Sequence, residues 1–191
     1  IATDDMYEHI LWSDEPFANI LTVCPALYDR TIVLNGVSKA YSMTGWRLGY
    51  ALLPPSLVKT FDLYNVNIAS CACTFSQHAA VEALRGPQDS VTSMVAEFRE
   101  RRDYLVEGLN RIQGISCGTP GGAFYAFANI TKTGSSSAEL ASRLLAEAGV
   151  AVLSGASFGP CGEGYIRLSY ATSMEKLRSG IERMTNLLGK R

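Results

Sequence analysis

Residues 36–50 read GVSKAYSMTGWRLGY, and this stretch decides how the rest of the chain is interpreted. Two short apolar runs flank it, TIVL at 31–34 and LGYALL at 48–53, and their β-branched and aromatic residues are typical of buried strands. Lys39 therefore lies just past the end of a predicted strand. Open α/β sheets bind ligands at strand ends, where a desolvated amine can act as a nucleophile and form an imine with an aldehyde.

The order of small and apolar residues around this lysine is specific. A small, an apolar and a small residue precede it, and a glycine, an arginine, an apolar residue and a second glycine follow: Gly36, Val37, Ser38, Lys39, Gly45, Arg47, Leu48 and Gly49. The pattern resembles the lysine motif of the class I/II aminotransferases, which are fold-type I enzymes that use pyridoxal 5′-phosphate. The resemblance implies that Lys39 forms the imine with the cofactor aldehyde and that Arg47 holds the cofactor phosphate. Without the motif, Lys39 would be interpreted as a surface lysine in a polar loop.

A second pair of candidate residues stands near the start of the chain. Residues 1–3 read as the end of a strand, and Asp4 and Tyr7 follow it. In the family that the chain resembles, an Asp-x-x-Tyr pair at this point meets the cofactor. The resemblance implies that Asp4 keeps the pyridine nitrogen protonated and that Tyr7 places its hydroxyl beside O3′. The residues alone also allow another interpretation, in which Asp4 is a helix N-cap and Tyr7 is a half-buried aromatic residue.

Composition narrows the class of protein. The chain has 191 residues, of which 47% are hydrophobic and 18% charged, and its net charge is −1. Basic residues do not cluster, which argues against nucleic acid, and no apolar run is long enough to cross a membrane. An odd number of cysteines at irregular spacings indicates reduced thiols and a cytoplasmic protein. Cys71 and Cys73 lack the further ligands of a zinc site, so we expect no metal.

The pattern of helices and strands predicts an α/β fold in two parts. Residues 1–113 are expected to be the C-terminal part of a large cofactor-binding domain with a mixed, mainly parallel sheet, and residues 114–191 a small α+β domain. A helix with Ser56 as N-cap and a long helix over 90–112 belong to the first part. The second part is expected to contain strands at 123–127, 150–153 and 165–170, a helix over 136–148, and a closing helix over 173–188 with Ser173 as N-cap.

Arg167 is the notable residue of the second part. It lies in an alternating strand, residues 165–170 (YIRLSY), where it shares a face with Tyr165 and Ser169. An arginine among apolar strand residues is costly unless an anion meets it. The family that the chain resembles carries an arginine in such a strand, so the resemblance implies that Arg167 pairs with the substrate α-carboxylate. A structural salt bridge to an Asp or Glu is the alternative.

These observations lead to three functional hypotheses. The first is an aminotransferase that moves an amino group between an L-amino acid and a 2-oxo acid; residues 43–47 (MTGWR) resemble its aspartate, aromatic and prephenate branch, and the resemblance implies a homodimer. The second is another enzyme on the same cofactor, such as a C–S lyase. The third is a non-catalytic fragment or a stable small domain with a remnant attached, because the resemblance covers only about the C-terminal half of a family chain. We expect the 191 residues alone to bind cofactor weakly or not at all, and to be inactive.

Overall fold

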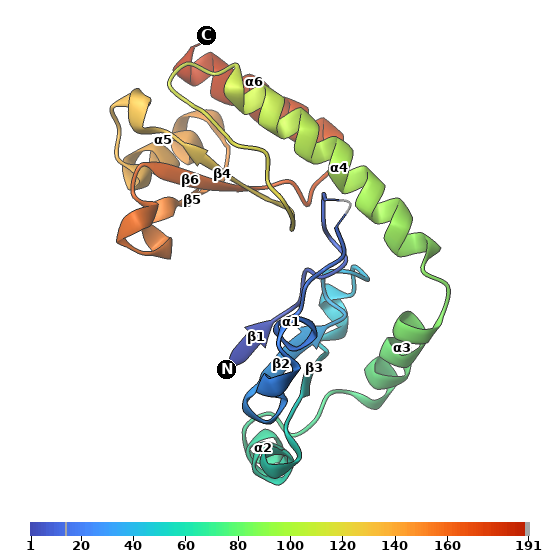
Figure 1. Ribbon diagram of the computed structural model, residues 1–191. Helices are drawn as coiled ribbons and strands as arrows, with labels where there is room; N and C mark the ends of the chain where they lie inside the picture. The colour runs from blue at the N-terminus through green and yellow to red at the C-terminus, as the bar shows by residue number, and fades with distance from the viewer. Residues whose placement is uncertain (14, 190–191) are drawn as a thin grey trace. The chain divides into compact units, whose positions relative to one another are not determined.

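The computed structural model describes residues 1–13 and 15–189, and the chain divides into two compact units (Figure 1). The N-terminal unit is Ile1–Met94 and the C-terminal unit is Val95–Arg191. Each combines a three-stranded sheet with helices, which confirms the α/β class. No helix among the described residues is both long and apolar enough to cross a membrane.

The N-terminal unit is built on a mixed sheet in the order β1-β2-β3, with β1 at Ala2–Asp4, β2 at Ile32–Gly36 and β3 at Gly49–Leu52. β1 runs parallel to β2 with Asp4 opposite Leu34, and β2 runs antiparallel to β3 with Gly36 opposite Gly49. One of these two pairings is parallel and the other antiparallel, so the sheet is mixed, as expected.

The helices of this unit are α1 (Ile20–Val23), α2 (Pro55–Ile68) and α3 (Thr74–Arg85), with a 3-10 turn η1 at Pro25–Arg30. α2 begins one residue before the expected N-cap, because Pro55 occupies its first turn and Pro54 is the N-cap. No residue of α2 is buried. Its large apolar side chains are exposed: Leu57, Val58, Phe61, Leu63, Tyr64, Val66 and Ile68.

The long helix α4 (Asp89–Asn110) crosses the boundary between the units. Its part from Val95 onward belongs to the C-terminal unit, where Phe98, Leu105 and Leu109 are buried. α4 runs beside α6 (Met174–Leu188), and a Cβ on Gly108 would lie 3.0 Å from Ile181 (Figure 1). This packing puts the division at 94/95, whereas the sequence places it at 113/114.

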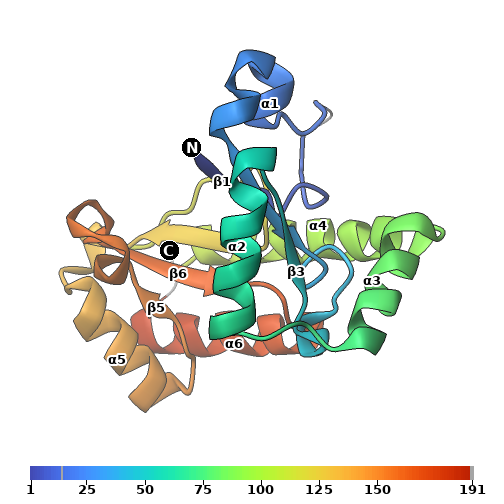
Figure 2. The same ribbon diagram turned by 90° about the horizontal axis from the view of Figure 1, so that it is seen from below.

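The C-terminal unit has a sheet in the order β4-β6-β5 with antiparallel pairings throughout, formed by Tyr125–Asn129, Tyr165–Ser169 and Leu153–Ser154 respectively. Figure 2 shows α5 (Ser137–Ala148) and α6 beside it. The predicted cap at Ser173 is confirmed, because its side chain accepts a hydrogen bond from the Lys176 amide. β5 is Leu153–Ser154, so it shares only Leu153 with the strand expected over 150–153.

Alternation along these strands separates a buried face from an open one. Ala126, Ala128, Ile166 and Leu168 lie on the buried face and contribute to the core. The intervening residues of β4 and β6 lie on the other face: Tyr125, Phe127, Tyr165 and Arg167. The sheet therefore holds Arg167 on its open face.

Candidate functional site

Strand register brings three of the expected site residues to one edge of the N-terminal sheet. Since β1 and β2 are parallel, both end at the same edge, and the antiparallel β3 begins there. Asp4 is the last residue of β1, Lys39 stands three residues past the end of β2, and Arg47 stands two residues before β3. A carboxylate, an amine and a guanidinium thus leave the sheet at this edge.

The turn that carries Lys39 is held by its own backbone. The Met43 amide donates to the Val37 carbonyl at 3.3 Å, and the Ser42 amide donates to the Lys39 carbonyl at 3.2 Å. Val37 and Ala40 are buried, while Lys39 is half-buried between them. Ser42 adopts a left-handed conformation with φ 52°. The two buried neighbours fix the backbone on either side of the amine.

Gly36 allows the segments at this edge to approach one another closely. A Cβ there would lie 3.1 Å from the Met6 Cε, the Leu48 carbonyl oxygen and the Gly49 Cα. These contacts are tighter than side-chain carbons normally make, so a larger residue would push the segments apart. The glycine at the start of the motif is therefore explained by packing at the end of β2.

Arg47 is exposed and opens onto a hollow. Its backbone is left-handed, with φ 51°, and its Nη1 donates to the Thr44 carbonyl at 2.9 Å. A cavity of about 480 Å³ lies beside it, lined also by Gly45, Trp46, Cys71, Ala72, Cys73, Phe75 and Ser76. The guanidinium keeps donors that this one bond does not use, and an anion in the hollow could accept from them.

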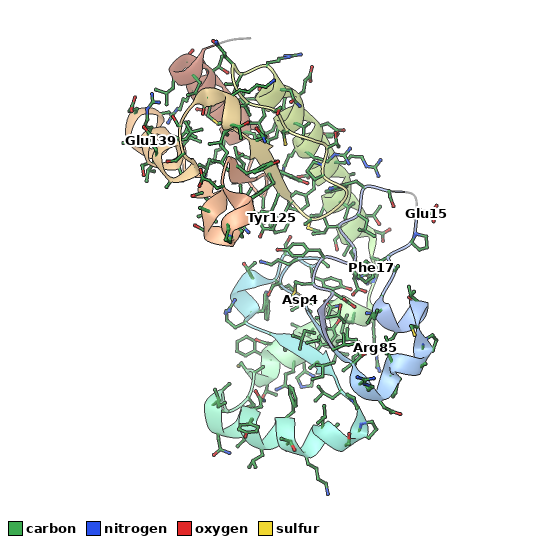
Figure 3. All side chains as sticks on the ribbon, turned by 60° about the vertical axis from the view of Figure 1, so that its left-hand side comes forward. Asp4, Glu15, Phe17, Arg85, Tyr125 and Glu139 are labelled. Atoms are coloured by element: carbon green, nitrogen blue, oxygen red, sulfur yellow. The ribbon has the colours of Figure 1, made fainter. Side chains whose placement is uncertain are left out.

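Asp4 and Tyr7 lie in a turn after β1. The Asp4 side chain is exposed at the strand end (Figure 3) and accepts a hydrogen bond from the Met6 amide at 3.2 Å. No helix follows it, so the alternative interpretation of Asp4 as a helix N-cap is wrong. Tyr7 is half-buried three residues further along, and its carbonyl accepts from the Ile10 amide at 2.9 Å.

The sequence analysis missed a polar contact beside these residues. The Glu8 carboxylate accepts a hydrogen bond from the Asn35 side chain at 2.6 Å, which ties the turn after β1 to β2. Burial and the nearby Glu8 charge raise the pKa of both Tyr41 and Tyr50. These phenols therefore stay protonated well into the alkaline range. No pattern in the sequence signals this contact, because Glu8 and Asn35 are 27 positions apart.

In the C-terminal unit, Arg167 lies between two aromatic rings. Its Cζ is 4.4 Å from the centre of the Tyr125 ring and 4.5 Å from that of Phe158. Among the described residues of this unit, no carboxylate pairs with it, so the structural salt bridge that the sequence allowed is not formed there. Cation–π contacts hold the guanidinium plane and leave its N–H groups available to an anion.

Taken together, the N-terminal unit presents an amine, a guanidinium and a carboxylate at one sheet edge, and the C-terminal unit presents a second guanidinium. This donor set suits a ligand that carries a carbonyl group and an anionic group. In the described part of the chain, no group of three or more His, Cys, Asp or Glu residues could hold a metal ion. The sequence identified all of these charged residues but neither aromatic neighbour of Arg167 as its contact.

Comparisons with known proteins find similar sequences and similar solved structures. The chain is 44% identical to an aspartate/prephenate aminotransferase of Nitrosomonas europaea, over 98% of this chain and 50% of that protein. Among solved structures, the aspartate aminotransferase of Rhizobium meliloti has a TM-score of 0.91 at 39% identity, covering 97% of this chain and 48% of that one. The aromatic aminotransferase of Pyrococcus horikoshii has a TM-score of 0.92 at 39% identity, covering 98% and 50%.

The chain spans about half the length of the curated relatives that it matches. The sequence model of the family described as aminotransferase class I and II matches residues 1–184. This match takes in the lysine stretch, the sheet edge and the strand of Arg167. The chain belongs to the class I and II aminotransferases.

Proposed function

We propose that the whole protein that carries this chain transfers an amino group between an L-amino acid and a 2-oxo acid, and that this chain supplies the catalytic lysine. The observation that carries the proposal is the sheet edge at which Asp4, Lys39 and Arg47 emerge together. An amine, a guanidinium and a carboxylate at one edge are the groups that this reaction needs.

The cofactor that fits this donor set is pyridoxal 5′-phosphate. Lys39 would hold it through the aldehyde, Arg47 through the phosphate, Asp4 through the ring nitrogen and Tyr7 through the ring hydroxyl. The fit rests on the hollow beside Arg47, which has room for an anion next to exposed donors. When bound, this cofactor supplies an aldehyde that exchanges amines and a protonated ring that accepts electron density.

The residues of the chain would then act in distinct ways. Arg167 would bind the α-carboxylate of the amino acid through two parallel N–H bonds, with its plane already fixed by Tyr125 and Phe158. The Lys39 amine would remove the proton from the substrate Cα. The Asp4 carboxylate would lie against the ring nitrogen and keep that nitrogen charged.

The substrate class follows from the relatives. The names of the similar proteins specify aspartate, prephenate and aromatic substrates for those proteins. We therefore propose a dicarboxylic or aromatic L-amino acid as donor for the whole protein. We also propose a homodimer, supported by the exposed apolar side chains of α2, and a cytoplasmic location, supported by free thiols at Cys24, Cys71, Cys73, Cys117 and Cys161.

An assay of two products tests the proposal on the whole protein. With an L-amino acid and a 2-oxo acid present, exchange of the amino group is expected, and the Lys39→Ala variant should lose it by several orders of magnitude. Release of pyruvate and ammonia without exchange would assign the protein to the C–S lyases instead. Lys132→Ala is the matched control, because Lys132 is exposed on the short 3-10 turn Thr131–Thr133 of the C-terminal unit, and it should keep full activity.

A further inference from the structure

A buried serine and an exposed glutamate hold one loop of the C-terminal unit closed. The Ser137 amide donates to Glu163 Oε1 at 2.8 Å, and its hydroxyl donates to Oε2 at 2.6 Å. Ser137 is fully buried and begins α5, so the carboxylate also lies at the helix N-terminus, where unpaired amides favour negative charge. The Ser154 hydroxyl joins this group 2.8 Å from that of Ser137.

The loop between these residues is pinched at its base. A Cβ on Gly155 would lie 2.0 Å from the Gly162 carbonyl oxygen, so the two backbones touch where only glycine fits. Two short 3-10 turns, η4 (Gly155–Phe158) and η5 (Pro160–Gly162), fill the loop. Phe158 therefore lies on a compact loop that the Glu163–Ser137 contact attaches to α5.

Phe158 is the part of this loop that reaches the open face of the sheet. Its ring lies 4.5 Å from the Arg167 Cζ, which is also 4.4 Å from the Tyr125 ring, and it forms a T-shaped pair with Phe127 at a centroid distance of 6.0 Å. A guanidinium stacked between two rings has lost most of its rotamer freedom before any ligand arrives. If the loop moved, the contact between the Phe158 ring and Arg167 would be lost.

We propose that the Glu163–Ser137 contact is a latch that holds Phe158 against Arg167 and so sets how tightly a substrate carboxylate binds. The inference rests on the proposed role of Arg167. Glu163 and Phe158 are then positioning residues that act through Arg167. Without the latch, binding must also immobilise the arginine, which raises KM for a carboxylate substrate about three- to tenfold and leaves kcat nearly unchanged.

The test compares two substrates in the whole protein: the amino acid with the highest turnover, and the amine that lacks its α-carboxylate. Arg167→Ala is the reference and should lower kcat/KM for the amino acid far more than for the amine. Glu163→Gln and Phe158→Leu should lower the ratio of kcat/KM for the amino acid to kcat/KM for the amine about three- to tenfold, through a higher KM for the amino acid. Phe158→Tyr keeps an aromatic ring at this position and should leave this ratio close to that of the unmodified protein.

The matched control is Glu147→Gln, which makes the same chemical change on α5 at a carboxylate that pairs with Arg143, and it should leave the ratio unchanged. An Arg167→Ala ratio equal to that of the unmodified protein would refute the proposed role of Arg167. If that variant lowers the ratio while Glu163→Gln and Phe158→Leu do not, or lower both substrates equally, the latch is refuted and the role of Arg167 stands.

Discussion

The Glu8 carboxylate accepts a hydrogen bond of 2.6 Å from the Asn35 side-chain amide, across the gap between the turn after β1 and the strand β2. One segment carries Asp4 and Tyr7, and the other leads into Lys39. This contact joins the two parts of the chain from which the proposed cofactor site is built.

Removing the Asn35 amide tests how much this contact stabilises the N-terminal unit. Asn35→Ala should lower the free energy of unfolding by about 1.5 kcal/mol, the lower end for a hydrogen bond to a charged group, because Glu8 is only half-buried. Chemical denaturation measures the change. Asn67→Ala removes a bond to the Leu63 carbonyl on the exposed helix α2 and should cost less than about 0.5 kcal/mol. Equal losses in both variants would contradict the account.

The latch makes stability depend on acidity. Hydrogen bonds from the Ser137 hydroxyl and amide, with a weaker one from the Gly164 amide, lower the pKa of Glu163 from its ordinary value of 4.5. The folded-state pKa lies below the unfolded one, so the contribution is complete above about pH 4.5 and is lost as pH falls through the folded-state value.

Denaturation curves taken at a series of pH values measure this effect. Glu163→Gln should reduce the stability difference between neutral and acidic pH, while Glu147→Gln should leave it as it is in the unmodified chain. Superimposable profiles for Glu163→Gln and the unmodified chain would show that the carboxylate contributes nothing at its observed position.

The five cysteines should differ in reactivity. Burial raises the pKa of the Cys117 thiol, against a smaller opposing effect of the Phe127 backbone, and only 7% of its surface is exposed. Cys161 in the same unit is exposed. Because the thiolate is the reacting form, pulse alkylation near neutral pH followed by peptide mass spectrometry should label Cys117 at least about tenfold more slowly than Cys161. Comparable rates would place Cys117 outside the core.

Two glycine substitutions in the C-terminal unit should change the free energy of unfolding in opposite directions. Gly162→Ala would put a Cβ 2.0 Å from the Gly155 carbonyl oxygen and should cost about 3 kcal/mol or more. Gly180→Ala lies inside α6 with nothing within 4 Å, and should stabilise by about 0.5–1 kcal/mol through helix propensity. Urea denaturation of both variants measures the difference. If Gly162→Ala left the free energy of unfolding unchanged, the close approach of the Gly155 and Gly162 backbones would be contradicted.

Local signals in the sequence predicted the parts of the fold that local contacts decide. The cap at Ser173, whose side chain accepts from the Lys176 amide, follows from residues three apart. The strands on either side of Lys39 follow from short apolar runs. Asp4, Lys39 and Arg47 could be proposed as site residues because Lys39 and Arg47 belong to one motif and Asp4 follows the end of a predicted strand.

Contacts between distant residues were beyond the reach of these signals. Ser137 and Glu163 are 26 positions apart and Glu8 and Asn35 are 27 apart, so no periodic pattern connects them. The contacts of Arg167 with the Tyr125 and Phe158 rings were missed for the same reason, because they join a strand to another strand and to a loop. The two compact units divide within α4, at 94/95, a point that depends on contacts between distant residues and not on where the helix ends.

The central claim is that the amine at position 39 is the one that meets the cofactor aldehyde. The whole protein should be incubated with pyridoxal 5′-phosphate, reduced with borohydride to fix the pyridoxyl group on the amine that binds it, and digested for peptide mass spectrometry. The account predicts one stoichiometric label on Lys39, lost in the Lys39→Ala variant. A label spread over Lys59 and Lys132, with Lys39 unmodified, would contradict it.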